Sequence, residues 1–173
     1  MACTSDITTG RTRVCKDSLG GAKKIYFFNY VEDPFTVVAN EATAINPLLT
    51  EVFEFEIEGD GNTLLQNFIG ERQNGTSVNT QTLTTIFKKQ DSDSSANLSF
   101  LVKGFPQSVV QDRNGNYHAL GIDDGMDVSI DASTGGAKTD LNGYTVTATA
   151  TTGSLAPILD SATVTAFLAL LPA

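Results

Sequence analysis

The sequence lacks tryptophan and contains a single histidine and two cysteines in 173 residues. One histidine with Cys3 and Cys15 is too small a set for a tetrahedral zinc site, and two cysteines do not make a disulfide framework. Both cysteines lie near the N-terminus, where compartment statistics favour two reduced thiols over a Cys3–Cys15 bridge. We therefore expect no metal and no cofactor.

Long apolar runs are also missing. No segment approaches the roughly 20 apolar residues of a membrane span, and the N-terminal residues lack the apolar core of a secretory signal peptide. The apolar run at residues 164–171 is too short to cross a bilayer. It favours a final strand over about 162–170, or a tail docked on a neighbour. We expect a soluble protein made inside a cell, with no membrane partner.

Basic residues are few and unevenly placed. The net charge is −9, so the chain is a poor candidate for binding nucleic-acid phosphates. Residues 1–24 hold five basic and two acidic residues, a net charge of +3, whereas the remainder holds six basic and 18 acidic residues, a net of −12. We interpret residues 1–22 as an extended basic arm and residues 23–173 as a single β domain.

The residues that are abundant favour β-structure. Thr, Ser, Asn and Gly suit strands and turns, and hydrophobic residues make up 40% of the chain, enough for a core. We expect roughly nine strands and one helix, in a mainly β fold: an antiparallel sandwich or barrel. The helix is predicted over about ten residues, with an N-cap among residues 91–93 and an end at Gly104.

The predicted first strand, residues 24–31, is apolar on both faces. Ile25, Phe27 and Val31 point one way, and Phe28 and Tyr30 point the other. A strand with two apolar faces meets something beyond its own core on one of them. We therefore predict that Phe28 and Tyr30 contact a neighbouring subunit.

Residues 51–58 alternate between aromatic or aliphatic and acidic side chains. One face carries Phe53, Phe55 and Ile57, and the other carries Glu54, Glu56 and Glu58. Paired catalytic carboxylates need different environments to separate their pKa values. Three glutamates in regular alternation are interpreted as a solvated acidic stripe.

Asn-Gly pairs mark two hairpins. Asn74-Gly75 separates strands at 63–73 and 77–87, which form one long hairpin with a polar tip, and Asn114-Gly115 separates strands at 108–111 and 116–122. The tip of the long hairpin is predicted to contact an adjacent protomer. Its residues are Gln73, Asn74, Gly75 and Thr76.

Motifs that carry chemistry are absent. His118 lies inside a predicted strand with no nucleophile beside it in sequence, and a dyad with Cys15 would need a distant contact. Residues 112–116 resemble the opening of a calcium loop, but the glycine stands at the fourth position instead of the sixth. A hairpin turn explains these residues better. We expect a protein that is not an enzyme.

Element order and short strings carry a family resemblance. After the long hairpin and the helix come NGNYHALG at 114–121, DGMDV at 124–128 and DLNGYTVT at 140–147. In this respect residues 82–151 resemble the tail-tube and tail-hub proteins of tailed bacteriophages. MAC at 1–3 and CKD at 15–17 are similar to virion proteins of phages that infect Bacteroidetes, including crAss-like phages.

The resemblance implies a structural virion protein assembled in the host cytoplasm. Protomers would join edge to edge into a hexameric or larger ring of the tail tube, tail hub or head–tail neck, beside other tail or neck proteins. Genome DNA would pass through the channel without specific binding, along the stripe of Glu54, Glu56 and Glu58. The arm, with Arg11, Arg13 and Lys16, would lie on an acidic neighbour.

Two other functions fit the same composition. One is a capsid decoration protein. The other is a β-sandwich module that binds a ligand such as carbohydrate, although the missing tryptophan weighs against it because such modules usually display exposed aromatic side chains.

Overall fold

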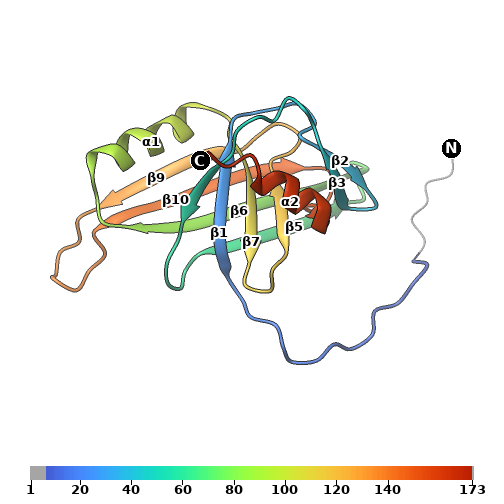
Figure 1. Cartoon of the computed structure of the whole chain (residues 1–173). Coiled ribbons are helices and arrows are strands. Elements are labelled where there is room, and N and C mark those ends of the chain that lie inside the picture. The colour runs from blue at the N-terminus through green and yellow to red at the C-terminus, as the bar shows by residue number, and fades with distance from the viewer. Residues whose placement is uncertain (1–6, 173) are drawn as a thin grey trace.

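A computed structural model describes residues 7–172 of the chain, so Cys3 lies outside the described residues. These residues form two β-sheets and two helices, with 43% of them in strands and 12% in helices (Figure 1). The prediction of a mainly β fold is confirmed. The body begins at Ala22, which lies in the first strand and in the core, one residue before the predicted boundary.

The larger sheet has seven strands. Neighbouring strands in it are antiparallel except for one parallel pair, β3 with β11. β4 forms one edge of this sheet and pairs only with β1 among the described residues. In spatial order the strands are β2 (Phe35–Val38), β3 (Glu41–Ile45), β11 (Ile158–Leu159), β8 (Tyr117–Leu120), β7 (Gln107–Asp112), β1 (Ala22–Phe28) and β4 (Phe53–Glu56).

The smaller sheet is antiparallel and contains the long hairpin. Its order is β5 (Thr63–Glu71), β6 (Thr76–Lys88), β10 (Gly143–Thr152) and β9 (Asp127–Ser133). The turns at Asn74-Gly75 and Asn114-Gly115 are both present, and each glycine has the positive φ that such turns require. Both predicted hairpins are confirmed.

The two sheets share one hydrophobic core. From the larger sheet, Ile25 and Phe27 of β1 enter it, and from the smaller sheet Leu83 and Val146 do so. Alternation explains this, because inward residues of β10 are buried while the threonines between them face outward.

A second core lies on the opposite face of the larger sheet, under helix α2 (Ser161–Leu168). The prediction of a strand over 162–170 is therefore wrong. Asp160 caps the helix by accepting a hydrogen bond from the Thr163 amide at 2.6 Å. Thr163 and Phe167, one helical turn apart, face the sheet and are buried. An unbroken apolar run does not distinguish a strand from a buried helix, and here packing decides.

This helix also corrects the prediction for Phe28. Phe28 is 2% exposed and packs edge-on against Phe35 and Phe167. β1 is apolar on both faces because the chain covers both faces itself, with the smaller sheet on one side and α2 on the other. Phe28 thus offers no surface to a second subunit.

Helix α1 (Ser92–Lys103) confirms the predicted helix. Its N-cap is Asp91, whose carboxylate accepts from the Ser94 amide at 2.7 Å, and its last turn closes with Gly104 N–H donating to the Phe100 carbonyl. Leu98 anchors α1 in the shared core. The rest of the helix lies across the end of the molecule, beside β9 and β4 (Figure 1).

Candidate functional site: the arm and the groove beside β4

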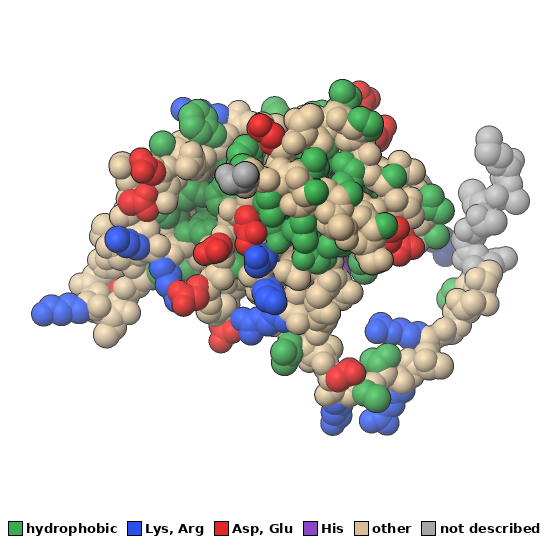
Figure 2. Space-filling model, in the orientation of Figure 1, with side chains coloured by type: hydrophobic (Ala, Val, Ile, Leu, Met, Phe, Trp, Pro, Cys, Tyr) green, Lys and Arg blue, Asp and Glu red, His purple; other side chains and the backbone are tan. Residues whose placement is uncertain are grey.

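The arm, residues 7–21, contains no helix or strand and is exposed along its whole length. Figure 1 shows it running away from the body, and Figure 2 shows basic side chains along it. Arg11, Arg13 and Lys16 are all exposed and form no ion pair with any described residue. The arm also exposes three large apolar side chains: Ile7, Val14 and Leu19.

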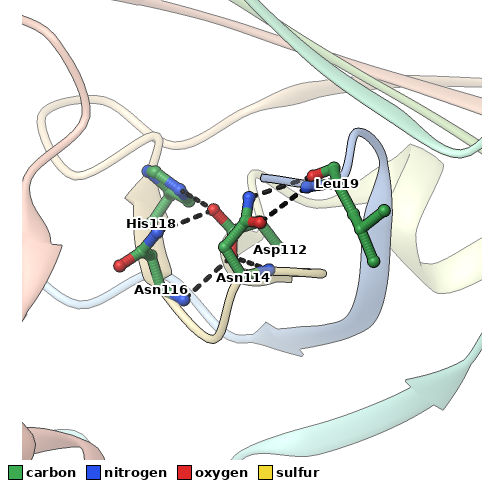
Figure 3. A network of polar contacts seen from close by, with 5 residues as sticks. All are labelled: Leu19, Asp112, Asn114, Asn116 and His118. Atoms are coloured by element: carbon green, nitrogen blue, oxygen red, sulfur yellow. Dashed lines mark hydrogen bonds and ion pairs between the residues drawn. The ribbon is translucent and has the colours of Figure 1, made fainter. Parts of the chain in front are cut away.

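The arm is held at its base by the β7–β8 turn (Figure 3). The Leu19 amide donates to Asn114 Oδ1 at 2.8 Å, and Asn114 Nδ2 donates back to the Leu19 carbonyl at 3.0 Å. Two residues further on, the Arg113 amide donates to the Gly21 carbonyl at 3.2 Å. These bonds fix the direction in which the arm leaves the body.

Asp112 holds that turn in shape. Its carboxylate accepts hydrogen bonds from the Asn114 amide at 2.8 Å and from both the backbone and the side chain of Asn116 at 2.9 Å. His118 Nε2 lies 3.4 Å away. Burial opposes ionisation of Asp112, but the hydrogen bonds from Asn116, His118 and Asn114 outweigh it and lower the pKa of the carboxyl. The turn thus uses the oxygens that a calcium loop would need.

His118 is half-buried and lies beside the Asp112 carboxylate. A hollow of about 330 Å³ lies beside it, lined among others by Leu19, Gln66 and Asp112. Cys15 does not line this hollow and lies exposed on the arm. Within residues 7–172, no three His, Cys, Asp or Glu side chains lie close enough together to hold a metal ion.

An apolar groove runs between β4 and α1, and we call it the β4 groove. One part, of about 590 Å³, is lined by Tyr30, Phe53, Phe100 and Phe105 together with the ends of β1 and α1. The adjoining part, of about 520 Å³, shares Phe55 and continues along Glu56 and Ile57. Figure 2 shows hydrophobic side chains gathered in this hollow with acidic side chains at its border.

The aromatic side chains of the β4 groove are unusually exposed. Phe100 is 69% exposed, Phe105 is 63% exposed and Phe53 is 42% exposed. Single exposed apolar residues are ordinary, but a contiguous group around a hollow marks an interaction surface.

Sequence patterns place Phe53 on an inward face of the chain. The structure leaves it half-exposed because β4 is an edge strand and α1 stands away from it.

The acidic stripe beside the groove is partly neutralised. Glu54 is half-buried and pairs with Lys24 at 2.6 Å, a contact that raises the pKa of Lys24. Glu58 pairs with Lys88 at 3.2 Å, whereas Glu56 forms no ion pair among the described residues. The predicted stripe is therefore not a row of three solvated charges. That this stripe faces a genome channel stays a prediction.

The remaining predicted contacts lie elsewhere on the surface. Residues 70–78 at the tip of the long hairpin are exposed, at the end of β6 opposite to α1. Tyr30 is half-exposed at the mouth of the groove, and its hydroxyl donates to the Asp123 carbonyl at 3.0 Å. The structure thus separates the hairpin tip from the groove.

Sequence reasoning missed Phe100, Phe105 and the role of β4 as an edge strand. The sequence held one signal for Phe100. It follows Leu98 by two residues on the helix, so it points away from the side that Leu98 buries. No sequence signal shows that β4 has a partner on one side alone, since this depends on contacts between distant segments.

No helix among the described residues is long and apolar enough to cross a membrane. No family model, curated protein or solved structure matches this chain.

Proposed function

We propose that this chain is a structural protein that assembles with copies of itself into a ring of a phage tail: a tail tube, tail hub or head–tail neck. The observation that carries the proposal is the arm. Fifteen described residues leave the body with three large apolar and three basic side chains exposed to solvent. Such a segment gains free energy when a neighbour covers it, by about 25 cal/mol per Å² of apolar surface buried.

Charge supports association between unlike surfaces. The described arm carries three basic residues and one acidic residue, a net of +2, while residues 22–172 hold eight basic and 18 acidic residues, a net of −10. Bodies repel one another, and an arm attracts a body, so arm-to-body contacts are favoured over body-to-body stacking. The same negative body lets DNA pass without binding it.

The polar groups beside His118 serve the fold, which suits a structural role. The hollow beside His118 belongs to the anchor of the arm, and the oxygens of Asp112 are occupied by the turn. The hollow beside Phe100 is lined by apolar and aromatic side chains, and Glu54 along it is paired with Lys24. This arrangement suits burial of another segment.

One observation favours a second function, a β-sheet module that binds a ligand. Tyr30, Phe53, Phe100 and Phe105 surround a single hollow, and aromatic faces of this kind stack on sugar rings. Titration of the purified chain with soluble oligosaccharides, followed by tyrosine fluorescence, checks this function. A saturable change that F100A abolishes, in a chain that stays monomeric, would replace the assembly proposal.

Mass measurement combined with electron microscopy tests the assembly proposal. Native mass spectrometry of the purified chain should give a closed oligomer, hexameric or larger, and negative-stain images should show rings with a central opening. A chain that remains monomeric at every concentration, with no ring in the images, would contradict the proposal.

A further inference from the structure

We infer that the β4 groove receives the arm of a second copy of this chain, which adds an extended strand to the free edge of β4. This inference rests on the proposed self-assembly and names its contact. It joins two features: an arm that exposes apolar and basic side chains, and a groove lined by exposed aromatic side chains.

The edge of the larger sheet is open at β4. This strand pairs with β1 through four residue pairs and with no other described strand. An uncovered edge is a template for pairing with another chain. An extended peptide that adds to such an edge gains main-chain hydrogen bonds, while pockets for alternate side chains give specificity.

The side chains of the two segments match in alternation. In an extended arm, Arg11 and Arg13 point to one side and Thr12 and Val14 to the other. Along β4, Phe55 and Glu56 likewise point to opposite sides.

A strand formed by residues 11–14 therefore places Val14 in the aromatic groove and the two arginines beside the glutamates. A slip of one residue would put arginine against phenylalanine, so the register is specified.

The occupant comes from a second copy because of where the arm is anchored. β7 and β4 flank β1 on opposite sides. Leu19 is held by Asn114 in the turn that follows β7, so the arm leaves on the side of β1 that faces away from β4 (Figures 1 and 3). To reach its own β4, the arm would have to reverse direction and cross β1.

Charge complementarity points to the same occupant. Glu56 lies beside the groove, is exposed, and forms no ion pair among the described residues. Glu51, just before β4, is likewise exposed and forms no ion pair within that part of the chain. Arg11 and Arg13 on the arm are equally unpaired within the described part of the chain. Docking therefore brings together charges of opposite sign that each copy leaves uncompensated.

Cross-linking between two versions of the full-length chain tests the inference. Both versions carry Cys3→Ser and Cys15→Ser. One adds Thr12→Cys and an affinity tag, and the other adds Asn97→Cys on the α1 side of the groove. As the matched control, Asn67→Cys replaces Asn97→Cys, because Asn67 is also exposed but lies on β5.

With a short bismaleimide, the mixture of T12C and N97C chains should form a cross-linked two-chain product. Its yield should be several-fold higher than the yield from the mixture of T12C and N67C chains. Equal yields from oligomers of unchanged mass would overturn this inference and leave self-assembly intact. A link within one chain carrying both T12C and N97C, without a two-chain product, would show that the arm folds onto its own groove. Absence of any oligomer would remove the proposed function as well.

Discussion

Asp112 shows how one side chain sets the position of the arm. Its carboxylate accepts three short hydrogen bonds from Asn114 and Asn116, and Asn114 in turn holds Leu19. Because these bonds stabilise the charged form, the pKa of Asp112 is lowered in the folded protein. Its contribution to stability is therefore present above the unfolded pKa, about 3.9, and is lost as the pH falls through the lower folded value.

Asp112→Asn should lower the free energy of unfolding at pH 7 by about 1–2 kcal/mol, since hydrogen bonds to a charged group are lost. The difference between wild type and variant should shrink at pH 3, below the unfolded pKa, because the unfolded chain takes up a proton there that the folded carboxylate resists. Urea unfolding at both pH values measures this. Asp131→Asn, at an exposed position on β9, is the matched control and should change little. An equal loss at both pH values would contradict the assigned role of the charge.

Substitution of one buried and one exposed phenylalanine distinguishes effects on folding from effects on assembly. Phe167 is fully buried against Tyr26, Phe28 and Phe35, so Phe167→Ala should cost about 3–5 kcal/mol of stability. Phe100 is exposed in the β4 groove, so Phe100→Ala should leave the thermal melt nearly unchanged and weaken self-association. Thermal melts and sedimentation of both variants check the pair. A strongly destabilised F100A variant would show that Phe100 belongs to the core.

Among the elements, those with local signals are the ones that sequence predicts. Asn-Gly turns and alternating residues determine the two hairpins, and Asp91 with Gly104 marks both ends of α1. α2 was missed because its apolar run has the same composition as a buried strand. Its packing over Phe28 and Phe35, together with the Asp160 cap, makes it a helix. The β4 groove was missed for a similar reason, because it arises where α1 meets β4, a strand that lies far from it in the sequence.

The long hairpin makes an element-scale prediction. Its exposed tip, with Gln73, Asn74, Gly75 and Thr76, lies away from both cores. Shortening β5 and β6 by one residue pair, Glu71 with Thr76, should leave the fold intact and block assembly between rings. Circular dichroism reports the fold, and electron microscopy reports stacked rings. A shortened protein that still stacks into full tubes would remove the tip from the assembly mechanism.

At the scale of the whole molecule, a basic arm is attached to an acidic body. Exposed charge pairs contribute about 0–1 kcal/mol each, but the contact repeats around a ring. Salt screens the arm-to-body attraction and the body-to-body repulsion alike, with a screening length of roughly 8 Å at physiological ionic strength. The sign of the salt effect is therefore not fixed by charge alone, and a charge swap is needed.

Replacing Arg11, Arg13 and Lys16 with Glu should weaken self-association at low salt and leave the thermal melt of the monomer nearly unchanged. In the same chain, Glu51→Arg and Glu56→Arg should restore part of the association, because the pairing is re-formed with reversed signs. Light scattering at two salt concentrations measures both. Unaltered assembly of the swapped protein would exclude an electrostatic role for the arm, and loss of the fold would place the arm in the core.

Sedimentation velocity of the full chain beside a chain lacking residues 1–16 tests the central claim, self-assembly through the arm, most directly. The shortened chain keeps Leu19 and the whole body, so its fold should be unchanged. We predict that the full chain sediments as a closed oligomer that persists on dilution, whereas the shortened chain sediments as a monomer. Two chains that sediment alike, both as monomers or both as the same oligomer, would contradict the claim.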